Sequence, residues 1–240
     1  MNKLNIELLN EEYKNKTAEE TVRFISNTLG KEKVILASSM SIEDQVLTDM
    51  FLKINPESRI FFIDTGRHFQ KTYDLMEETM QRYKFNYEVY APETNELETV
   101  LSKHSPNLFY ESVELRKKCC EIRKVNPLKR VLSTVDGWIC GLRRNQSQTR
   151  QEIEIFEWDN SHSINKINPL AFWTEDMVWE YIKKNNVPSS YLYNNGFRSI
   201  GCQPCTRAVK PGEDVRSGRW WWEDPDKKEC GLHIRMEGKA

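Results

Sequence analysis

The sequence predicts an α/β fold built on a doubly wound, mostly parallel sheet. Apolar runs at 34–37, 59–63 and 138–141 have the continuous hydrophobicity typical of strands that are buried on both faces. The first two runs are each followed by a polar turn and a segment with helical periodicity, at 42–53 and 69–83. Alternating strands and helices predict a sheet whose strands are joined by right-handed crossovers.

Start and stop signals mark further helices. Thr17 and Glu20 form a capping box before a helix that Gly30 ends, and Thr174 caps a helix that runs to about Lys184. The other expected elements are a strand at 85–90, a helix at 95–102, a basic helical segment at 119–132 interrupted by Pro127, and a hairpin or edge strands at 152–158 and 163–167.

The 240 residues are enough for one substantial domain with a functional extension. We expect a nucleotide-binding α/β domain over residues 1–186. Residues 187–240 contain prolines, glycines, tryptophans and charges without a sustained period. We therefore expect an irregular C-terminal segment there, with no second independent core.

Charge and hydropathy exclude several classes of partner. The chain has 35 basic and 36 acidic side chains, which gives no general electrostatic case for nucleic acid or a membrane surface. No apolar stretch approaches the ~18 residues of a spanning helix, and no signal peptide is evident. We expect a cytoplasmic protein, in which six cysteines favour metal binding or redox chemistry over disulfides.

Four of the cysteines form two pairs. Cys119-Cys120 and Cys202-Gln203-Pro204-Cys205 lie about eighty residues apart, so only folding can bring them together. Four thiolates suit either structural zinc or an iron–sulfur cluster. Neighbouring helical side chains point about 100° apart, which is awkward for one zinc tetrahedron and easier for separate irons. The spacing favours a cluster over zinc, and unligated thiols remain an alternative.

Cationic side chains accompany these cysteines. Arg123 and Lys124 each follow a cysteine by four residues and so share its helical face, where they can offset thiolate charge and hold an anion. Arg216 and Arg219 are candidates to close the same pocket from the C-terminal segment. Each arginine also fits an ordinary surface position.

Polar turns follow the expected strands. Ser38 and Ser39 can donate hydrogen bonds to an anion at a helix start, although the turn lacks the glycines of known phosphate loops. Asp64 ends the second strand, at the sheet edge where open α/β folds bind ligands. Ordinary capping and a tight turn are the alternatives. Two such turns at one edge favour a nucleotide.

Arg143, Arg144 and Arg150 follow the strand at 138–141. Their guanidinium groups match phosphate and sulfate oxygens, although a solvated loop is the alternative. A lone cysteine, Cys230, lies near the C-terminus with His233 beside it, which suits an accessible nucleophilic thiolate or an incidental residue.

Two features have no assigned role. Cys140 is expected to be a small core residue. The run Trp220-Trp221-Trp222 must either pack or await a partner.

Together these residues resemble the adenylyl-sulfate (APS) and phosphoadenylyl-sulfate (PAPS) reductases of assimilatory sulfate reduction. The resemblance covers roughly residues 33–233. In that family the four-cysteine set marks the branch that carries a four-iron four-sulfur (4Fe–4S) cluster and typically uses APS. The motifs that carry the resemblance are SSMSIED at 38–44, DTGRH at 64–68, KCCEIRKV at 118–125, GLRRNQS at 141–147, IGCQPCTR at 200–207 and KECGLH at 228–233.

The resemblance implies a fold of the adenine nucleotide alpha hydrolase type and a thioredoxin-dependent reduction of APS to sulfite and AMP. Cys230 would attack the sulfur of APS and carry an S-sulfocysteine, which thioredoxin or a glutaredoxin-like dithiol would release. It implies cysteine biosynthesis as the setting, and a homo-oligomer. The implied site residues are the cluster ligands Cys119, Cys120, Cys202 and Cys205, the sulfate and phosphate contacts Lys124, Arg216, Arg219 and His233, and the nucleotide contacts Ser38, Ser39, Asp64, Gly141 and Arg143.

Two other functions fit the same residues. The nearer one is a cluster-containing enzyme that uses PAPS, or both substrates, because a basic pocket can hold a 3'-phosphate. The other is a zinc-containing nucleotide-binding or tRNA-modifying protein on the same fold.

Overall fold

The computed structural model describes residues 3–146 and 150–224. The chain divides into two compact units whose segments alternate along the sequence. Of the described residues, the first unit comprises 3–62, 70–88, 132–146 and 150–191, and the second comprises 63–69, 89–131 and 192–224. The domain boundary expected at residue 186 stays a prediction.

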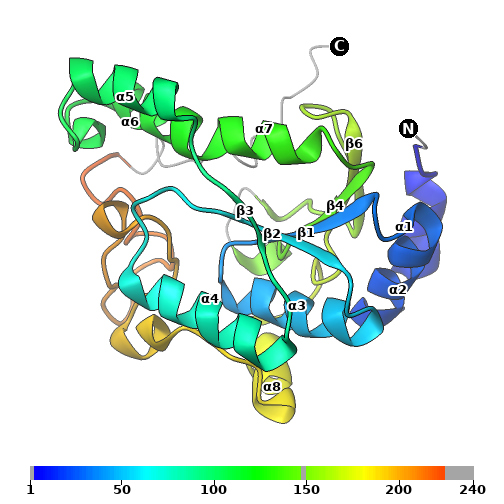
Figure 1. Ribbon diagram of the computed structural model, residues 1–240. Coiled ribbons are helices and arrows are strands. Elements are labelled where there is room, and N and C mark those ends of the chain that lie inside the picture. The colour runs from blue at the N-terminus through cyan, green and yellow to red at the C-terminus, as the bar shows by residue number, and fades with distance from the viewer. Residues whose placement is uncertain (1–2, 147–149, 225–240) are drawn as a thin grey trace. The chain divides into compact units, whose positions relative to one another are not determined.

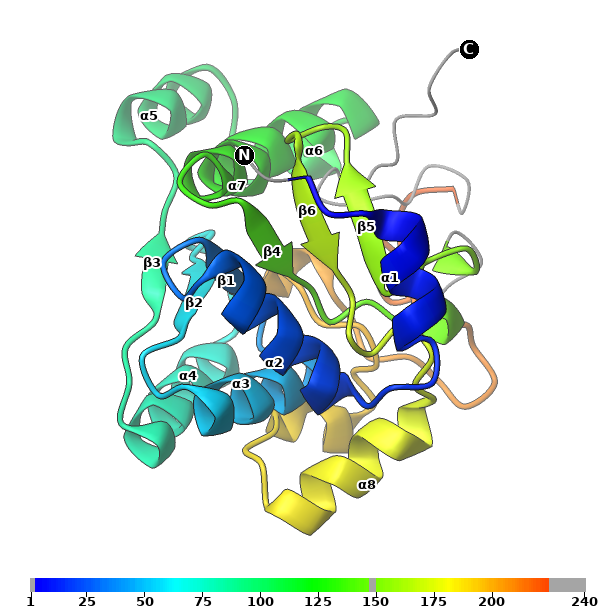
Figure 2. The same cartoon turned by 90° about the vertical axis from the view of Figure 1, so that its right-hand side faces the viewer.

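The sheet is mixed, mostly parallel and six-stranded, in the order β3-β2-β1-β4-β6-β5 (Figures 1 and 2). The central strand β1 pairs in parallel with β2 and β4, and β4 pairs in parallel with β6. Only β5 runs antiparallel, against β6. The strands are β1 (Val34–Ser38), β2 (Arg59–Ile63), β3 (Glu88–Tyr90), β4 (Gly137–Ile139), β5 (Phe156–Asp159) and β6 (Ile164–Ile167).

This sheet confirms the predicted fold class. The strand expected at 85–90 is shorter, at three residues. The expected hairpin is present, and its second strand β6 joins the parallel sheet through β4.

The helices of the first unit largely follow their start signals. At α2 the Thr17 side chain accepts from the Glu20 backbone while the Glu20 carboxylate accepts from the Thr17 backbone, so the capping box is confirmed. In Figure 1, α3, α4 and α8 lie on one side of the strands. These helices are α2 (Ala18–Leu29), α3 (Ile42–Ile54), α4 (Gln70–Tyr83) and α8 (Glu175–Asn185).

One further helix, α1 (Ile6–Tyr13), was not predicted from the sequence, and it lies beside β5 in Figure 2. Asn10 holds it there, because its side-chain amide donates to the Phe156 carbonyl and accepts from the Phe156 amide, both at 2.9 Å. This contact with a distant strand has no local sequence signal. No helix among the described residues is long and apolar enough to cross a membrane.

The second unit contains α5 (Thr94–Lys103) and a helical run formed by α6 (Val113–Cys120), a π-helical turn (Glu121–Val125) and α7 (Asn126–Leu132). The expectation that this run begins at Cys119 was wrong. Ser112 caps it, because its side chain accepts from the Leu115 amide. Pro127 does not interrupt it, because Pro127 lies in the first turn of α7, where a missing N–H costs little.

The C-terminal segment shares an apolar cluster with residues 100–122, and the expectation that it has no independent core stays a prediction. Trp220 is 1% exposed in an apolar cluster of the second unit that includes Leu108, Phe109 and Ile122. Two guanidinium groups lie over the Trp220 ring, with the carbon of Arg116 at 4.7 Å and that of Arg219 at 4.6 Å from its ring centre. Trp220, the first tryptophan of the run 220–222, is therefore a core residue.

Candidate active site

The four paired cysteines line one cavity of the second unit, which we call the thiol cavity. Cys119 and Cys120 come from the end of α6, Cys205 ends the short helical turn Gln203–Cys205, and Cys202 caps the start of that turn. The free volume among the side chains is about 20 Å³, which is room for one water molecule. The cavity is lined by Arg67, Phe109, Arg116, Cys119, Cys120, Arg123, Lys124, Cys202, Pro204 and Cys205.

Hydrogen bonds fix the turn that carries Cys202 and Cys205. The Gln203 amide donates to the Arg67 carbonyl at 2.8 Å, and the Thr206 hydroxyl donates to the Cys202 carbonyl at 2.9 Å. The Tyr110 hydroxyl donates to the Pro204 carbonyl at 2.8 Å. The backbone that carries Cys202 and Cys205 is thus held in a defined position.

Cations surround the thiols within the same unit. Arg123 is buried and donates to the Thr65 carbonyl at 2.6 Å. Arg219 is 7% exposed and lies so close to Gly201 that a Cβ at that position would be 2.4 Å from its guanidinium. A side chain at position 201 would therefore require this guanidinium to shift. These positive charges offset the negative charge that ionised thiols would bring into an apolar environment.

The surroundings of these thiols shift their pKa values in different directions. Burial raises the pKa of Cys205 to about 12 and also raises the pKa of Cys119. Burial opposes ionisation of Cys202 too, but the Lys124 ammonium and the Thr65 hydroxyl outweigh it and lower the pKa of that thiol. The Thr65 oxygen and the Cys202 sulfur are 3.3 Å apart.

The described residues contain no group of three His, Cys, Asp or Glu side chains arranged to hold one metal ion. An iron–sulfur cluster makes a different demand, because each thiolate binds a separate iron. Four convergent thiols with adjacent cations fit that donor set.

Four predicted nucleotide contacts of the first unit gather at the N-terminus of α3. Ser39 donates to the Asp44 carboxylate from its backbone amide at 2.7 Å and from its hydroxyl at 2.6 Å. Ser38 precedes it and is 5% exposed. A Cβ on Gly141 would be 2.4 Å from an Asp44 oxygen, so the chain after β4 approaches α3 more closely than any other residue allows.

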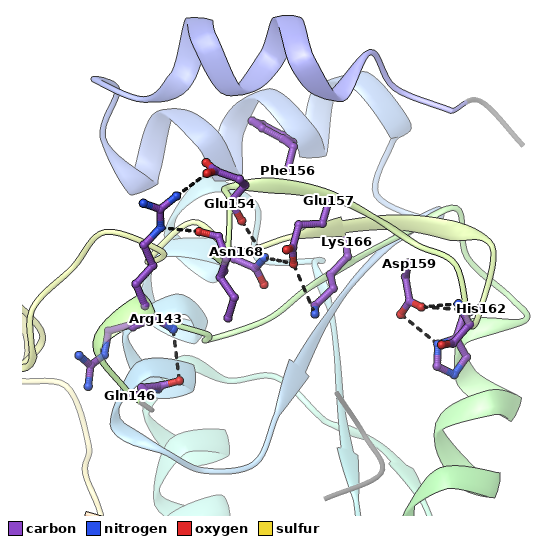
Figure 3. A network of polar contacts seen from close by, with 12 residues as sticks. Arg143, Gln146, Glu154, Phe156, Glu157, Asp159, His162, Lys166 and Asn168 are labelled. Carbon is purple, nitrogen blue, oxygen red and sulfur yellow. Dashed lines mark hydrogen bonds and ion pairs between the residues drawn. The ribbon is translucent and has the colours of Figure 1, made fainter. Parts of the chain in front are cut away.

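Arg143 reaches the same helix terminus. Its Nε donates to a Glu43 oxygen at 2.9 Å, and both side chains are almost fully buried. The Arg143 amide donates to the Gln146 side chain at 3.2 Å, as Figure 3 shows. This guanidinium therefore already has a carboxylate partner, and its contact with a nucleotide stays a prediction.

The remaining predicted residues lie elsewhere. Asp64 belongs to the second unit, where its carboxylate accepts from the Gly66 amide at 2.8 Å. Arg216 is half-buried, and it does not line the thiol cavity. Cys230 and His233 lie outside the described residues.

Sequence reasoning missed the acidic partners of these sites. Glu43 and Asp44 are 5% and 6% exposed, and Glu223 is paired with Arg116 in the interior. An acidic first turn is ordinary at helix starts, so Glu43 and Asp44 carried no distinct signal. Arg116 precedes Cys120 by four residues and so shares its helical face, a spacing that could have identified it.

Comparisons with known structures define the class of fold. The chain superposes on the crystal structure of a PAPS reductase from Candida auris with a TM-score of 0.74 and 28% identity, over 87% of this chain and 98% of that one. An NH3-dependent NAD synthetase from Campylobacter jejuni aligns with a TM-score of 0.50 at 10% identity, over 77% of this chain and 75% of that one. The fold is of the adenine nucleotide alpha hydrolase type.

Sequence comparisons define the family. The model of the phosphoadenosine phosphosulfate reductase domain matches residues 33–208. A protein of Burkholderia cepacia named adenosine 5'-phosphosulfate reductase is 48% identical, over 85% of this chain and 81% of that one. One of the same name from Allochromatium vinosum is 46% identical, over 85% and 80%. The chain belongs to the phosphoadenosine phosphosulfate reductase domain family.

Asp44 makes a prediction about pH. Burial raises the pKa of its carboxyl to about 6 from an ordinary value of 3.8, against the hydrogen bonds from Ser39. Between these values the folded protein binds more protons than the unfolded one, so its free energy of unfolding falls as pH rises from about 4 to about 6. Asp44→Asn has no carboxyl that titrates at this position. This fall in the free energy of unfolding, which amounts to at most about 3 kcal/mol, is therefore expected to be absent in the variant. Denaturant unfolding of both proteins across this range measures it, and parallel pH profiles would contradict it.

The buried pair of Arg116 and Glu223 makes a prediction about stability. The two side chains are joined by contacts of 2.9 and 2.8 Å and are 1% and 3% exposed. Glu223→Ala leaves a buried guanidinium unpaired and is expected to lower the free energy of unfolding by about 3–5 kcal/mol.

The control for Glu223→Ala lies on the helical run that carries Arg116. Lys118 and Glu121 form a pair at 2.9 Å with about half of each side chain exposed. Glu121→Ala is expected to cost less than about 1 kcal/mol. Equal losses for the two variants in denaturant titrations would show that burial of the Arg116 pair is not what matters.

Proposed function

We propose that this protein reduces adenosine 5'-phosphosulfate (APS) to sulfite and AMP in assimilatory sulfate reduction, and so supplies sulfur for cysteine biosynthesis. One observation carries the proposal: four thiols and four cationic side chains line a single cavity. The chain that forms it is 48% identical to a protein named for this activity. Such a cavity combines a cofactor donor set with the positive charge that a doubly anionic substrate requires.

We assign a 4Fe–4S cluster to Cys119, Cys120, Cys202 and Cys205. The fit rests on the donor chemistry and on Arg116, Arg123 and Lys124 around it, which balance the charge of ligated thiolates. When bound, the cluster would order the pocket and shape the electric field there. The redox state of the cluster would stay the same during turnover. The chemical steps belong to the side chains of the protein.

The first step is a nucleophilic displacement at sulfur. The Cys230 thiolate attacks the sulfur of APS, a bond forms between the two sulfur atoms, and the bond from sulfur to the phosphate oxygen breaks. AMP leaves with that electron pair. The product on the protein is an S-sulfocysteine at Cys230.

A dithiol reductant completes the reaction. One of its thiolates attacks the Cys230 sulfur, and sulfite leaves with the electron pair of the broken sulfur–sulfur bond. The second thiol of the reductant then displaces the Cys230 thiolate and closes a disulfide, so the reductant loses two electrons. We propose thioredoxin or a glutaredoxin-like protein for this role, in a cytoplasmic homo-oligomer.

Cationic groups assist departure of AMP. Lys124 lines the thiol cavity, and Arg219 is buried in the same unit. With Arg216 and His233 they would neutralise the charge that develops on the phosphate oxygen. The proposed nucleotide contacts are Ser38, Ser39, Asp64, Gly141 and Arg143.

A second candidate is a reductase that uses phosphoadenylyl sulfate (PAPS), or both substrates. The structural match to a PAPS reductase favours keeping it. The two substrates differ by a 3'-phosphate, and kcat/KM for each separates the candidates. We expect a preference for APS, and a strong preference for PAPS would overturn that choice.

The proposed intermediate predicts a mass. Anaerobic incubation of the protein with APS and no reductant is expected to add one SO3 group to the Cys230 peptide, because the dithiol reductant that would remove it is absent. Cys230→Ser is expected to show no adduct and no sulfite release.

Cys140→Ser is the matched control for this mass measurement. Cys140 is a buried thiol, 2% exposed, and its pKa is raised by burial. The control is expected to retain the adduct. Sulfite release by Cys230→Ser at the normal rate would refute the mechanism.

A further inference from the structure

An exposed cluster of aromatic side chains lies in the second unit, and we call it the aromatic patch. It comprises Tyr110, Trp221 and Trp222, and it rests on the buried ring of Phe109. Tyr110 is 46% exposed and Trp221 is 41% exposed, with their ring centres 6.4 Å apart. Large rings exposed side by side are typical of interaction surfaces.

The patch is continuous with the thiol cavity. The Tyr110 hydroxyl donates to the carbonyl of Pro204, which lies between Cys202 and Cys205 and lines the cavity. Phe109 also lines the cavity. A partner on the patch therefore sits next to the proposed active site.

The length of the chain indicates which partner this is. Cys230 follows Trp222 by eight residues, so its sulfur is within about 28 Å of the patch whatever path the chain takes. A dithiol protein of about 100 residues is roughly 34 Å across, judging from a radius of gyration of about 13 Å. A protein of this size that touches Cys230 can reach the patch at the same time.

The composition of the patch suits such a partner. Redox encounters bury less area than stable complexes, and a few tryptophan and tyrosine side chains carry much of the energy in small interfaces. Tyr110 and Trp221 have rings that are already packed against Trp222, at 4.4 and 4.8 Å between centres, so little side-chain entropy is lost on binding.

We propose that the aromatic patch is the docking surface for the dithiol protein that regenerates Cys230. This inference rests on the proposed function, because it needs an S-sulfocysteine for the partner to attack. Trp221 contributes binding to the protein reductant and takes no part in formation of the adduct. A small dithiol has no surface to dock and does not use the patch.

The test compares two reductants in the full-length protein. Trp221→Ala is expected to raise the KM for a purified thioredoxin at least about fivefold, the effect of one interface aromatic. Turnover with dithiothreitol and the rate of adduct formation without reductant are expected to stay within about twofold of the unaltered protein. Trp221→Tyr keeps an exposed ring and is expected to restore the KM for thioredoxin.

Phe172→Ala is the matched control, because Phe172 is 42% exposed but lies in the first unit, where it stacks on Arg144. It is expected to leave the KM for thioredoxin unchanged. An unchanged KM in Trp221→Ala, or equal losses with thioredoxin and dithiothreitol, would refute docking at the patch. Failure of the unaltered protein to form the Cys230 adduct would instead refute the proposed function.

Discussion

Four thiols must share one buried site, and the second unit is arranged to meet that constraint. Thiol groups in an apolar cluster resist ionisation, and ionised thiols repel one another. The arginine and lysine side chains around the thiols counter both effects. One of these cations, Arg116, is itself buried, and Glu223 pairs with it. The ion pair, the Trp220 ring and the apolar cluster thus together hold positive charge beside the buried thiols.

The same constraint explains two unusual backbone positions. Gly201 has no side chain because Arg219 occupies the space where a Cβ would lie. A π-helical turn follows Cys119 and Cys120, and such turns often occur at functional sites, where they redirect the side chains around them. In this helical run the turn carries Arg123 and Lys124, which line the thiol cavity. Backbone geometry and charge therefore act on the same group of cysteines.

Local signals in the sequence were enough to predict the sheet and most helices. The capping box at Thr17 and the buried runs of β1 and β2 each depend on neighbouring residues alone. Contacts between distant residues escaped prediction. Asn10 pairs with Phe156 and Arg116 with Glu223, and neither pair has a sequence pattern that reveals its partner. The paired cysteines were recognisable because their type and spacing restrict their chemistry.

The N-terminus of α3 shows where residue types alone were not enough to predict a site. Serines at a helix start predicted an anion site, but Asp44 accepts from Ser39 and Glu43 accepts from Arg143. An incoming phosphate would meet two carboxylates as well as the helix dipole, and a raised pKa at Asp44 reduces that repulsion at acidic pH. Ser38, Ser39, Gly141 and Arg143 lie at this terminus, whereas Asp64 belongs to the second unit. The hydrogen bonds to Glu43 and Asp44 followed only from the fold.

The central claim is that the four thiols hold an iron–sulfur cluster. The most direct measurement is the iron, zinc and acid-labile sulfide content of anaerobically purified protein, with Cys202→Ser beside it. The account predicts about four irons and four sulfides per chain, little zinc, and loss of both iron and sulfide in the variant. Stoichiometric zinc without iron or sulfide would contradict it.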